Sequence, residues 1–513
     1  MAIMKSLMPM IDRRAMIAAS TAALILPRPL MAATRSEPFS FETLIARAQE
    51  LTKAPFRETP PYPAAQAIDY TELHQAQFRD DRTIWGNLPG DTGIRLFPLG
   101  KYAAQPVQIA LVDKGRATPL RYDPGMFDAP ADNPVKKLPP DAGFAGFRIM
   151  NAARDGDWMS FLGASYFRAP GPTKQFGLSA RAIAINTSMS GKEEFPRFTH
   201  FWLERTSNNS VTVYALMDGA SITGAFRFVC SLGKEGVKQD VTGALFPRRA
   251  IPELGLMPMT SMFWYDQAHR NLSTDWRSEI HDSDLLSIAS ADGTAQARPI
   301  INPPFPRTAA FAERNPKGFG LLQRDRNFDH YQDDGVFYER RPSLWSTPVT
   351  PLGDGQVRLY EFPTDSEYTD NVAAYWVPAA TPTPGKRIDV AYHLDWTAAH
   401  GPASAGMATI ENVWRGRGDK PGIERLVIDF AGLPDGVKPE IWSDITGGTL
   451  LKTAGYPILH QPGQFRVQID LKRDGNGIAD IRAQLRAGGR GISEYVHYPV
   501  TERREPTEGP AVS

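Results

Sequence analysis

The chain has 513 residues, which is long enough to bury a sizeable core and suggests two domains. Lys and Arg together number 57, as do Asp and Glu, so the formal charge is zero. A chain without net charge lacks the strong positive field that binding to nucleic acid or an anionic membrane requires, and it favours a neutral ligand. The 44 Pro, 43 Gly and 10% aromatic residues, without long helical periodicity, favour many strands joined by turns.

The N-terminus resembles a twin-arginine export signal. Arg13 and Arg14 precede an apolar run over residues 15–26, and the small residues Ala32 and Ala33 follow. A transmembrane helix needs about 20 apolar residues, and Pro27 interrupts this run before that length is reached. We therefore expect residues 1–33 to be a cleaved signal peptide, export to the periplasm by the twin-arginine route, and a mature protein that does not span the membrane.

Two helices are expected early in the mature chain. Ser40 can cap a helix whose apolar residues from Phe41 to Leu51 fall at helical spacing, and a second short helix is predicted over residues 70–78. From about residue 93 the pattern changes to short strands rich in Val, Ile and aromatic residues. The clearest of these strands are residues 94–99, 107–112, 161–168, 201–205, 211–217 and 225–229.

The Pro-rich segment 378–384 has no apolar periodicity and predicts a linker. Further strand-like runs follow it, and the tail is long enough for a small sandwich of immunoglobulin size. Cys230 is the only cysteine, so no intramolecular disulfide is possible, and its strand-like context predicts a small buried hydrophobe.

Several common catalytic motifs are absent from the sequence. There is no HExxH, P-loop, GxSxG or paired CxxC, so zinc-hydrolase, nucleotide and serine-hydrolase chemistry lack support. Asp325-x-Asn327-x-Asp329 and Asp474-x-Asn476 imitate the start of a calcium loop, but neither has the closing Glu. We therefore expect no metal and no cofactor, and we interpret residues 474–477 as a hairpin turn.

The segment 360–378 is the most informative part of the chain. It sets Asp365, Glu367 and Asp370 in a short polar loop between two apparent strands, beside aromatic residues. Glycoside hydrolysis needs one protonated carboxyl group at the leaving oxygen and one carboxylate that activates water or attacks. Turns also collect Asp, Ser and Thr for backbone reasons, so an acidic, solvated hairpin turn is the alternative.

Three other segments, residues 193–205, 276–284 and 319–345, combine aromatic, Arg and acidic residues in the same way. Together they could line a sugar groove, because aromatic faces cover pyranose rings while polar side chains bind hydroxyl groups. Each of them could also be core residues plus surface ion pairs.

A series of runs along the mature chain resembles the OpgG/OpgD (MdoG/MdoD) family of periplasmic glucan biosynthesis proteins, and the twin-arginine signal is more similar to the OpgD branch. These runs are GFAGFRI (143–149), FLGASYFR (161–168), FGLSARAIAI (176–185), EEFPRF (193–198), MTSMF (259–263), HDSD (281–284), GFGLLQRDR (318–326), RRPSLW (340–345) and TDNVAAYW (369–376). The tail after Pro384 matches more loosely. One departure is Tyr338-Glu-Arg-Arg-Pro, where the family often has Tyr-Asp-Leu-Arg-Pro.

The resemblance implies an all-β protein. A large galactose-mutarotase-like β-sandwich is expected over residues 34–377, a linker over 378–386, and a smaller immunoglobulin-like β-sandwich over 387–513. It also implies action on osmoregulated periplasmic glucan as an inverting endo-β-1,2-glucanase, with Asp370 as general acid and Asp282 as general base. On the same basis Tyr338 and Glu367 are expected to bind the substrate. The other substrate-binding residues that we expect are Arg324, Trp345, Trp376, His281 and Tyr166.

Two alternatives remain open from the sequence. One is a non-catalytic glucan-binding or scaffold protein that assists a membrane glucan synthase, and the other is a transferase that adds glucan branches.

Physical chemistry adds two expectations for the acid and base. Asp370 must keep its proton near neutral pH, so we expect Trp376, Tyr368 and neighbouring carboxylates to raise its pKa, while Asp282 beside His281 stays ionised. Inversion requires the two carboxyl groups to lie about 6.5–9.5 Å apart, or farther if water or sugar hydroxyls relay the proton.

Overall fold

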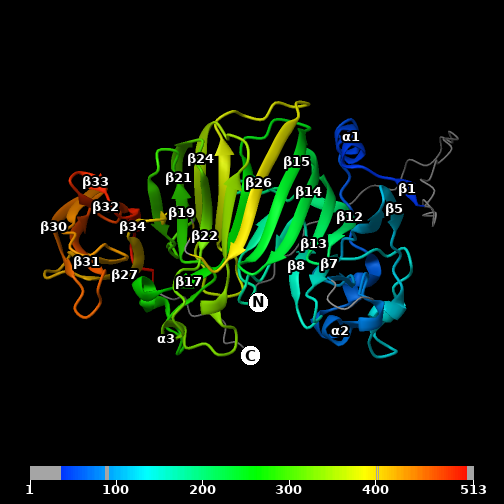
Figure 1. Cartoon of the computed structure of the whole chain (residues 1–513), viewed down its shortest axis with the longest axis horizontal. Coiled ribbons are helices and arrows are strands. Elements are labelled where there is room, and N and C mark those ends of the chain that lie inside the picture. The colour runs from blue at the N-terminus through cyan, green and yellow to red at the C-terminus, as the bar shows by residue number, and fades with distance from the viewer. Residues whose placement is uncertain (1–35, 87–91, 400, 402–403, 505–513) are drawn as a thin grey trace, which may run out of the picture. The chain divides into compact units, whose positions relative to one another are not determined.

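The computed structural model describes residues 36–86, 92–399, 401 and 404–504, and the expected signal peptide lies outside these ranges. Within them β-strands dominate, and two large sheets pack face to face (Figure 1). The prediction of an all-β protein is therefore confirmed.

The larger sheet runs from the N-terminal strands to the C-terminal ones. Its hydrogen-bonded order is β1 (Glu37–Pro38), β5 (Arg116–Pro119), β4 (Gln108–Asp113), β12 (Arg197–Ser207), β13 (Ser210–Asp218), β14 (Ile222–Gly233), β15 (Gly236–Pro247), β26 (Ile388–Thr397), β23 (Ser343–Pro348), β22 (Gly318–Leu322), β19 (Leu285–Ala289), β20 (Ala295–Pro299), β34 (Tyr495–Val500), β32 (Ala479–Ala487) and β29 (Glu440–Thr446), with β33 (Arg490–Gly491) on β32.

The second large sheet is antiparallel throughout. Its order is β21 (Arg307–Arg314), β24 (Asp354–Glu361), β25 (Val372–Pro378), β16 (Leu254–Ser261), β10 (Ser179–Arg181), β9 (Tyr166–Arg168), β8 (Asp157–Leu162), β7 (Gly146–Met150) and β3 (Gly93–Phe97), with β11 (Ile183–Ile185) on β16.

Aromatic side chains fill the space between the two sheets. Phe161 of β8 packs on Phe201 of β12 and on Phe228 of β14, with ring centroids 5.7 and 5.4 Å apart. Both contacts are edge-to-face, the arrangement that the ring quadrupole favours, and all three rings are buried. Cys230 of β14 is buried in the same core, as predicted, and burial raises the pKa of its thiol to about 12.

Helices are few and short in the described chain. They are α1 (Phe41–Leu51), α2 (Tyr70–Gln75) and α3 (Phe328–Tyr331), with 3₁₀ turns η1 (Pro63–Ala67), η2 (Asp80–Arg82), η3 (Pro124–Met126), η4 (Pro134–Lys137), η5 (Gln267–Leu272) and η6 (Tyr338–Arg340). The Ser40 side chain accepts a hydrogen bond from the Thr43 N–H, so the predicted N-cap of α1 is confirmed. The apolar stripe of α1, including Leu44 and Ala48, packs against Ala225 and Ala244 of β14 and β15.

The segment expected to link two domains instead connects the two large sheets. After β25 the chain crosses into the larger sheet as β26, which is hydrogen-bonded along its length to β15 on one side and β23 on the other. The expected linker at 378–386 is thus an inter-sheet loop, and the large sheet extends one full strand beyond the expected boundary. Proline signals a break in local structure but not which sheet the chain enters next.

A second, smaller sandwich follows. A four-stranded sheet of β27 (Thr409–Arg417), β28 (Glu424–Ala431), β31 (Phe465–Arg473) and β30 (Gly448–Pro457) shares a core with β32 and β34. The turn at 474–477 joins β31 to β32, which belong to different sheets, so the expected hairpin is a connection between layers. Two small ladders complete the fold, β17 (Phe263–Tyr265) with β18 (Ile280–His281), and β2 (Gln77–Phe78) with β6 (Phe127–Asp128). None of the helices in the described residues has the length and apolar character to cross a bilayer.

Candidate active site

A cleft of 440 Å³ brings Asp282 and Asp370 to one place. Asp282 follows β18, whereas Asp370 lies in the loop between β24 and β25. The residues that line the cleft are Arg168, Phe176, Gly177, Asp282, Arg341, Glu367, Tyr368 and Asp370. The acidic loop is therefore part of a composite site with η6 and the end of β9.

Two buried asparagines hold the ends of the acidic loop. Asn302 accepts a 3.0 Å hydrogen bond from the Thr364 N–H and donates one of 2.7 Å to the Thr364 carbonyl. Asn371, directly after Asp370, accepts a 2.8 Å bond from the Phe263 N–H and donates one of 2.9 Å to the Phe263 carbonyl. Because both amides are buried and fully engaged, they fix where the loop leaves and rejoins the sheet.

Asp370 lies among protein atoms but remains accessible to water in the cleft. Loss of surrounding water raises its pKa, and the charges of Arg168 and Arg341 act in the opposite direction. The expected direction is thus found, but the cause is burial and not neighbouring carboxylates. Trp376 contributes no face to the cleft, since it is fully buried in the core, whereas Tyr368 does line it.

Asp282 is 5% exposed and forms an ion pair with Nη1 of Arg341. A positive charge in contact with a carboxyl group stabilises its carboxylate form. His281 is its neighbour only in sequence, because the imidazole ring turns to Gln323 at 2.9 Å and Glu279 at 3.0 Å. The partner of Asp282 in the cleft is therefore an arginine.

Arg341 forms an ion pair with Asp282, and its charge also acts on Asp370. Its guanidinium carbon lies 3.8 Å from the centroid of the Tyr338 ring, in a cation–π contact. Burial lowers the pKa of Arg341 to about 10, against the charges of Glu367 and Asp370. The side chain remains a cation at neutral pH, placed to interact with both Asp282 and Asp370.

Glu367 is held by Arg277 and Tyr338. Arg277 reaches both carboxylate oxygens of Glu367, at 3.0 and 3.2 Å, and also binds Asp275 and Asp333. Burial disfavours the charged form of Arg277, but these hydrogen bonds outweigh it and raise its pKa above the ordinary value. The cluster orients Glu367 at the edge of the cleft.

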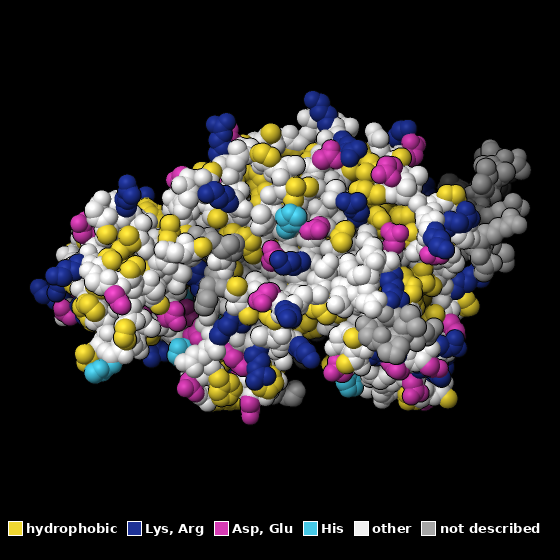
Figure 2. Space-filling view, viewed as in Figure 1, with side chains coloured by type: hydrophobic (Ala, Val, Ile, Leu, Met, Phe, Trp, Pro, Cys, Tyr) yellow, Lys and Arg dark blue, Asp and Glu magenta, His cyan; other side chains and the backbone are white. Residues whose placement is uncertain are grey.

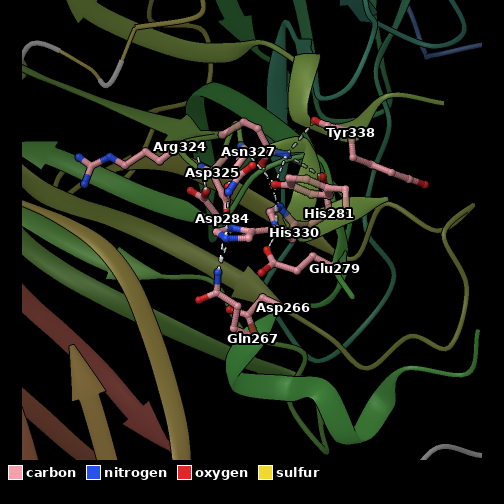
Figure 3. A network of polar contacts seen from close by, with 12 residues as sticks. Asp266, Gln267, Glu279, His281, Asp284, Arg324, Asp325, Asn327, His330 and Tyr338 are labelled. Atoms are coloured by element: carbon pink, nitrogen blue, oxygen red, sulfur yellow. Dashed lines mark hydrogen bonds and ion pairs between the residues drawn. The ribbon is translucent and has the colours of Figure 1, made fainter. Parts of the chain in front are cut away.

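Six of the seven expected sugar-binding residues do not line the cleft, and four of these six are Trp345, Trp376, Arg324 and His281. Trp345 and Trp376 are core residues of β23 and β25, 3% and 0% exposed. Arg324 forms a buried bidentate ion pair with Glu494, at 2.7 and 2.5 Å, and points away from His281 in Figure 3. His281 is completely buried. These expectations are corrected, because a side chain buried in the core presents no surface to a ligand in the cleft.

Tyr166, another expected contact, lies close to Asp370 but does not line the cleft. Burial raises the pKa of Tyr166, and the charge of Asp370 adds to this rise. The Arg181 guanidinium covers its ring, 5.6 Å from the centroid. Tyr338 is also buried, and it affects the cleft only through its contacts with Glu367 and Arg341.

Sequence reasoning missed three arginines at this site, Arg168, Arg277 and Arg341. Arg277 and Arg341 stand inside segments already singled out for their aromatic and acidic residues, and Arg168 ends the run 161–168 that carries part of the family resemblance. What the sequence lacked was the pairing of each arginine with a carboxylate far along the chain.

A larger groove of 1090 Å³ lies elsewhere, between β24, β25 and β32, and contains neither Asp282 nor Asp370. Size alone therefore does not identify the site. Basic and acidic side chains are interspersed over the face seen in Figure 2, in keeping with the zero net charge and a neutral ligand.

Comparison of the sequence with known proteins identifies a family. A family model described as "Periplasmic glucan biosynthesis protein, MdoG" matches residues 39–500. Glucans biosynthesis protein D 2 of Ralstonia nicotianae is 40% identical over 96% of this chain and 98% of its own length. Glucans biosynthesis protein D of Xanthomonas campestris pv. campestris is 40% identical over 91% of this chain and 92% of its own length.

Among solved structures, similarity is distant. A galactose mutarotase related enzyme from Lactobacillus acidophilus matches 50% of this chain and 91% of its own, at 12% identity and a TM-score of 0.22. A polysaccharide lyase matches 70% of this chain and 44% of its own, at 10% identity and a TM-score of 0.21.

Proposed function

Because the chain belongs to the MdoG family of periplasmic glucan biosynthesis proteins, we propose that it is an inverting glycoside hydrolase that cleaves the β-1,2-linked backbone of periplasmic glucan. The observation that carries this proposal is that Asp282 and Asp370 line one cleft in different electrostatic environments. Asp370 has a raised pKa, whereas Asp282 is paired with a guanidinium. Two carboxyl groups whose environments separate their proton affinities are what acid–base cleavage of a glycoside needs.

In the proposed mechanism Asp370 donates its proton to the oxygen of the scissile glycosidic bond. Asp282 accepts a proton from the attacking water on the opposite face of the sugar ring, either directly or through a sugar hydroxyl. Arg341 pairs with Asp282 and offers hydrogen bonds to the substrate. As the leaving sugar departs, Asp370 becomes charged, and Arg168 and Arg341 stabilise that charge.

The other cleft residues suit a sugar polymer. Tyr368 is 91% exposed, so its ring offers an open face for stacking against a pyranose, and Phe176 lines the same cleft. Glu367 and Arg168 provide a hydrogen-bond acceptor and a donor for hydroxyl groups. The cleft is open to solvent, as an enzyme that cleaves within a long chain requires.

The decisive experiment compares linear β-1,2-, β-1,3- and β-1,4-glucans as substrates of the mature protein. We expect turnover of the β-1,2-glucan with an inverted product anomer by NMR. The Asp370→Asn and Asp282→Asn variants should each lose about 10²- to 10⁴-fold in kcat, the usual contribution of a general acid or base. Asp354→Asn is the matched control, because Asp354 is an exposed carboxylate at the start of β24.

Each outcome discriminates between the candidate functions. Wild-type rates in Asp370→Asn would refute the assignment of the acid. Tight binding of β-1,2-glucan without cleavage would identify a scaffold that assists a membrane glucan synthase, and transfer of glucosyl units to a second glucan chain would identify a branching transferase. Export by the twin-arginine route is part of the proposal, and replacement of Arg13 and Arg14 by Lys should leave the precursor in the cytoplasm.

A further inference from the structure

A second group of acidic side chains lies on the other side of His281, outside the cleft. It surrounds a cavity of 50 Å³ whose walls include Asp266, Glu279, Asp284 and Asp325. The amide side chains of Gln267 and Asn412 line the same cavity. Figure 3 shows these carboxylates converging from separate segments of the chain, with His330 beside them.

Three of these side chains have the spacing of metal ligands. One carboxylate oxygen of Glu279, one of Asp325 and one ring nitrogen of His330 all lie within 4.8 Å of one another. Glu279 precedes β18, Asp325 follows β22, and His330 lies in α3. Nδ1 of His330 is already 2.5 Å from Oδ2 of Asp325, so the two potential ligands are held together.

The cavity also contains buried carboxylate oxygens without a hydrogen-bond partner. Glu279 is 2% exposed, and its Oε2 accepts a bond from His281, but Oε1 has no partner among the described residues. Asp284 repeats the pattern, because Oδ2 accepts two backbone N–H bonds of 2.8 Å while Oδ1 has none. An unpaired oxygen of a buried carboxylate costs more than an ordinary lost hydrogen bond, so such oxygens indicate a ligand.

The charges around the cavity favour a cation. Five acidic residues line the cavity, Asp266, Glu279, Asp284, Asp325 and Glu411, against one imidazole ring, that of His281, and the Arg324 guanidinium is bound to Glu494 through both of its Nη atoms. The amide nitrogen of Gln267 lies 3.3 Å from Asp325 Oδ2 and 3.2 Å from Asn412 Oδ1, where acceptor atoms converge. Rotation of that amide by half a turn would present its oxygen at the same point as a further ligand.

We propose that Glu279, Asp325 and His330 bind one divalent transition-metal ion. Two carboxylates with one imidazole suit Mn²⁺ or Zn²⁺, whereas Mg²⁺ and Ca²⁺ prefer oxygen ligands alone. The incomplete calcium-loop pattern at residues 325–329 does not supply this set, because Asn327 caps α3 through the Asp329 N–H at 3.1 Å. Two of the ligands thus come from outside that pattern.

The proposed ion has a structural role. It joins the residues before β18, the end of β22 and α3. It also fixes Glu279, the hydrogen-bond partner of the buried His281 that precedes Asp282. The ion therefore supports the wall of the cleft without contact with the substrate, and its presence does not depend on what the cleft does.

Metal binding to the full mature protein tests this proposal. After treatment with a chelator and dialysis, the protein is titrated with Mn²⁺, Zn²⁺, Mg²⁺ or Ca²⁺ in a calorimeter, and bound metal is measured by mass spectrometry. We expect one equivalent of Mn²⁺ or Zn²⁺, weaker binding of Mg²⁺ and Ca²⁺, and a higher melting temperature of the loaded protein.

Variants locate the ion. Glu279→Gln and His330→Gln should each weaken binding by about 10- to 100-fold or more, since changes even beyond the ligands cost that much. His393→Gln is the matched control, because His393 forms a 2.6 Å pair with Asp240 between two exposed side chains and should leave the affinity unchanged. His330 is only half-buried, so its variant keeps the test valid if Glu279→Gln fails to fold. No bound metal, or equal affinity in all three variants, would overturn the proposal.

Discussion

The hydroxyl group of Tyr338 donates a 2.6 Å hydrogen bond to Oε2 of Glu367, the same oxygen that accepts one of 3.0 Å from Arg277. This contact joins η6 to the acidic loop, so two segments that carry cleft residues are held in one arrangement. Glu367 is consequently an organising residue as well as part of the cleft surface.

Tyr338→Phe removes this hydrogen bond and keeps the ring under Arg341. A hydrogen bond to a charged group contributes about 1.5–3 kcal/mol, and we expect the free energy of unfolding to fall by that amount. Urea denaturation followed by fluorescence measures the change. Tyr70→Phe is the control, because Tyr70 is 72% exposed, and an equal loss in both variants would contradict the assigned role.

Arg277→Met should lower the free energy of unfolding more than Tyr338→Phe does. The substitution leaves Asp275, Asp333 and Glu367 close together without their shared cation. Breaking a buried ion pair on one side typically costs about 3–5 kcal/mol, which we expect to find in the free energy of unfolding. Arg314→Met removes an arginine whose side chain is 79% exposed and should change stability by less than about 0.5 kcal/mol. Comparable losses of stability in the Arg277→Met and Arg314→Met variants would show that Arg277 does not hold the three carboxylates together.

The melting temperature of the Asp370→Asn variant, relative to that of wild type, should increase as pH rises. The folded-state pKa of Asp370 lies above the ordinary 3.8, so the native state binds more protons than the unfolded state in the pH window above 3.8. Stability from this group is complete below that value and is lost as pH rises through the folded-state pKa. Asn carries no charge at any pH, so the melting temperature of the variant, measured against wild type, should increase between acid and neutral pH.

Asp292→Asn provides a control of opposite sign for that experiment. The backbone N–H of Thr294 lowers the pKa of Asp292, so its stabilising effect is present above 3.8 and is lost as pH falls. Its replacement should reduce the melting temperature at neutral pH. The same pH trend in both variants would mean that burial does not control the pKa of Asp370.

Arg168→Met should shift the pH dependence of glucan cleavage. Arg168 lowers the pKa of Asp370, so its removal should move the alkaline limb of the kcat/KM profile to higher pH. The limb reports loss of the proton from the general acid. Steady-state rates on β-1,2-glucan over a pH series measure the shift, with Arg314→Met as the unchanged control. A limb that stays in place or moves down would exclude Asp370 as the titrating group.

Local signals in the sequence were sufficient for the elements that depend on neighbouring residues. The cap at Ser40, the buried Cys230 and the loop between β24 and β25 each follow from a few adjacent side chains. The pairing of Asp282 with Asp370 came instead from the family resemblance, because no periodicity relates positions so far apart. The cleft they share is a property of the fold.

Partners distant in sequence explain the failures. Trp345 and Trp376 combine with acidic neighbours in the sequence, but composition cannot tell which face of a strand points to the core. Arg324 looks available until Glu494 of the C-terminal sandwich is brought against it. The resemblance was weakest in that tail, so the residue that neutralises Arg324 could not be anticipated.

The position of β26 determines the order in which the large sheet can be completed. β15 and β23 have no neighbour on their facing edges until residues 388–397 have been synthesised and inserted between them. A chain that ends at residue 377 would leave two long edges with free N–H and C=O groups, which invite pairing between molecules. Any fragment meant to isolate the cleft must therefore keep β26, and a truncation at the proline-rich loop should aggregate.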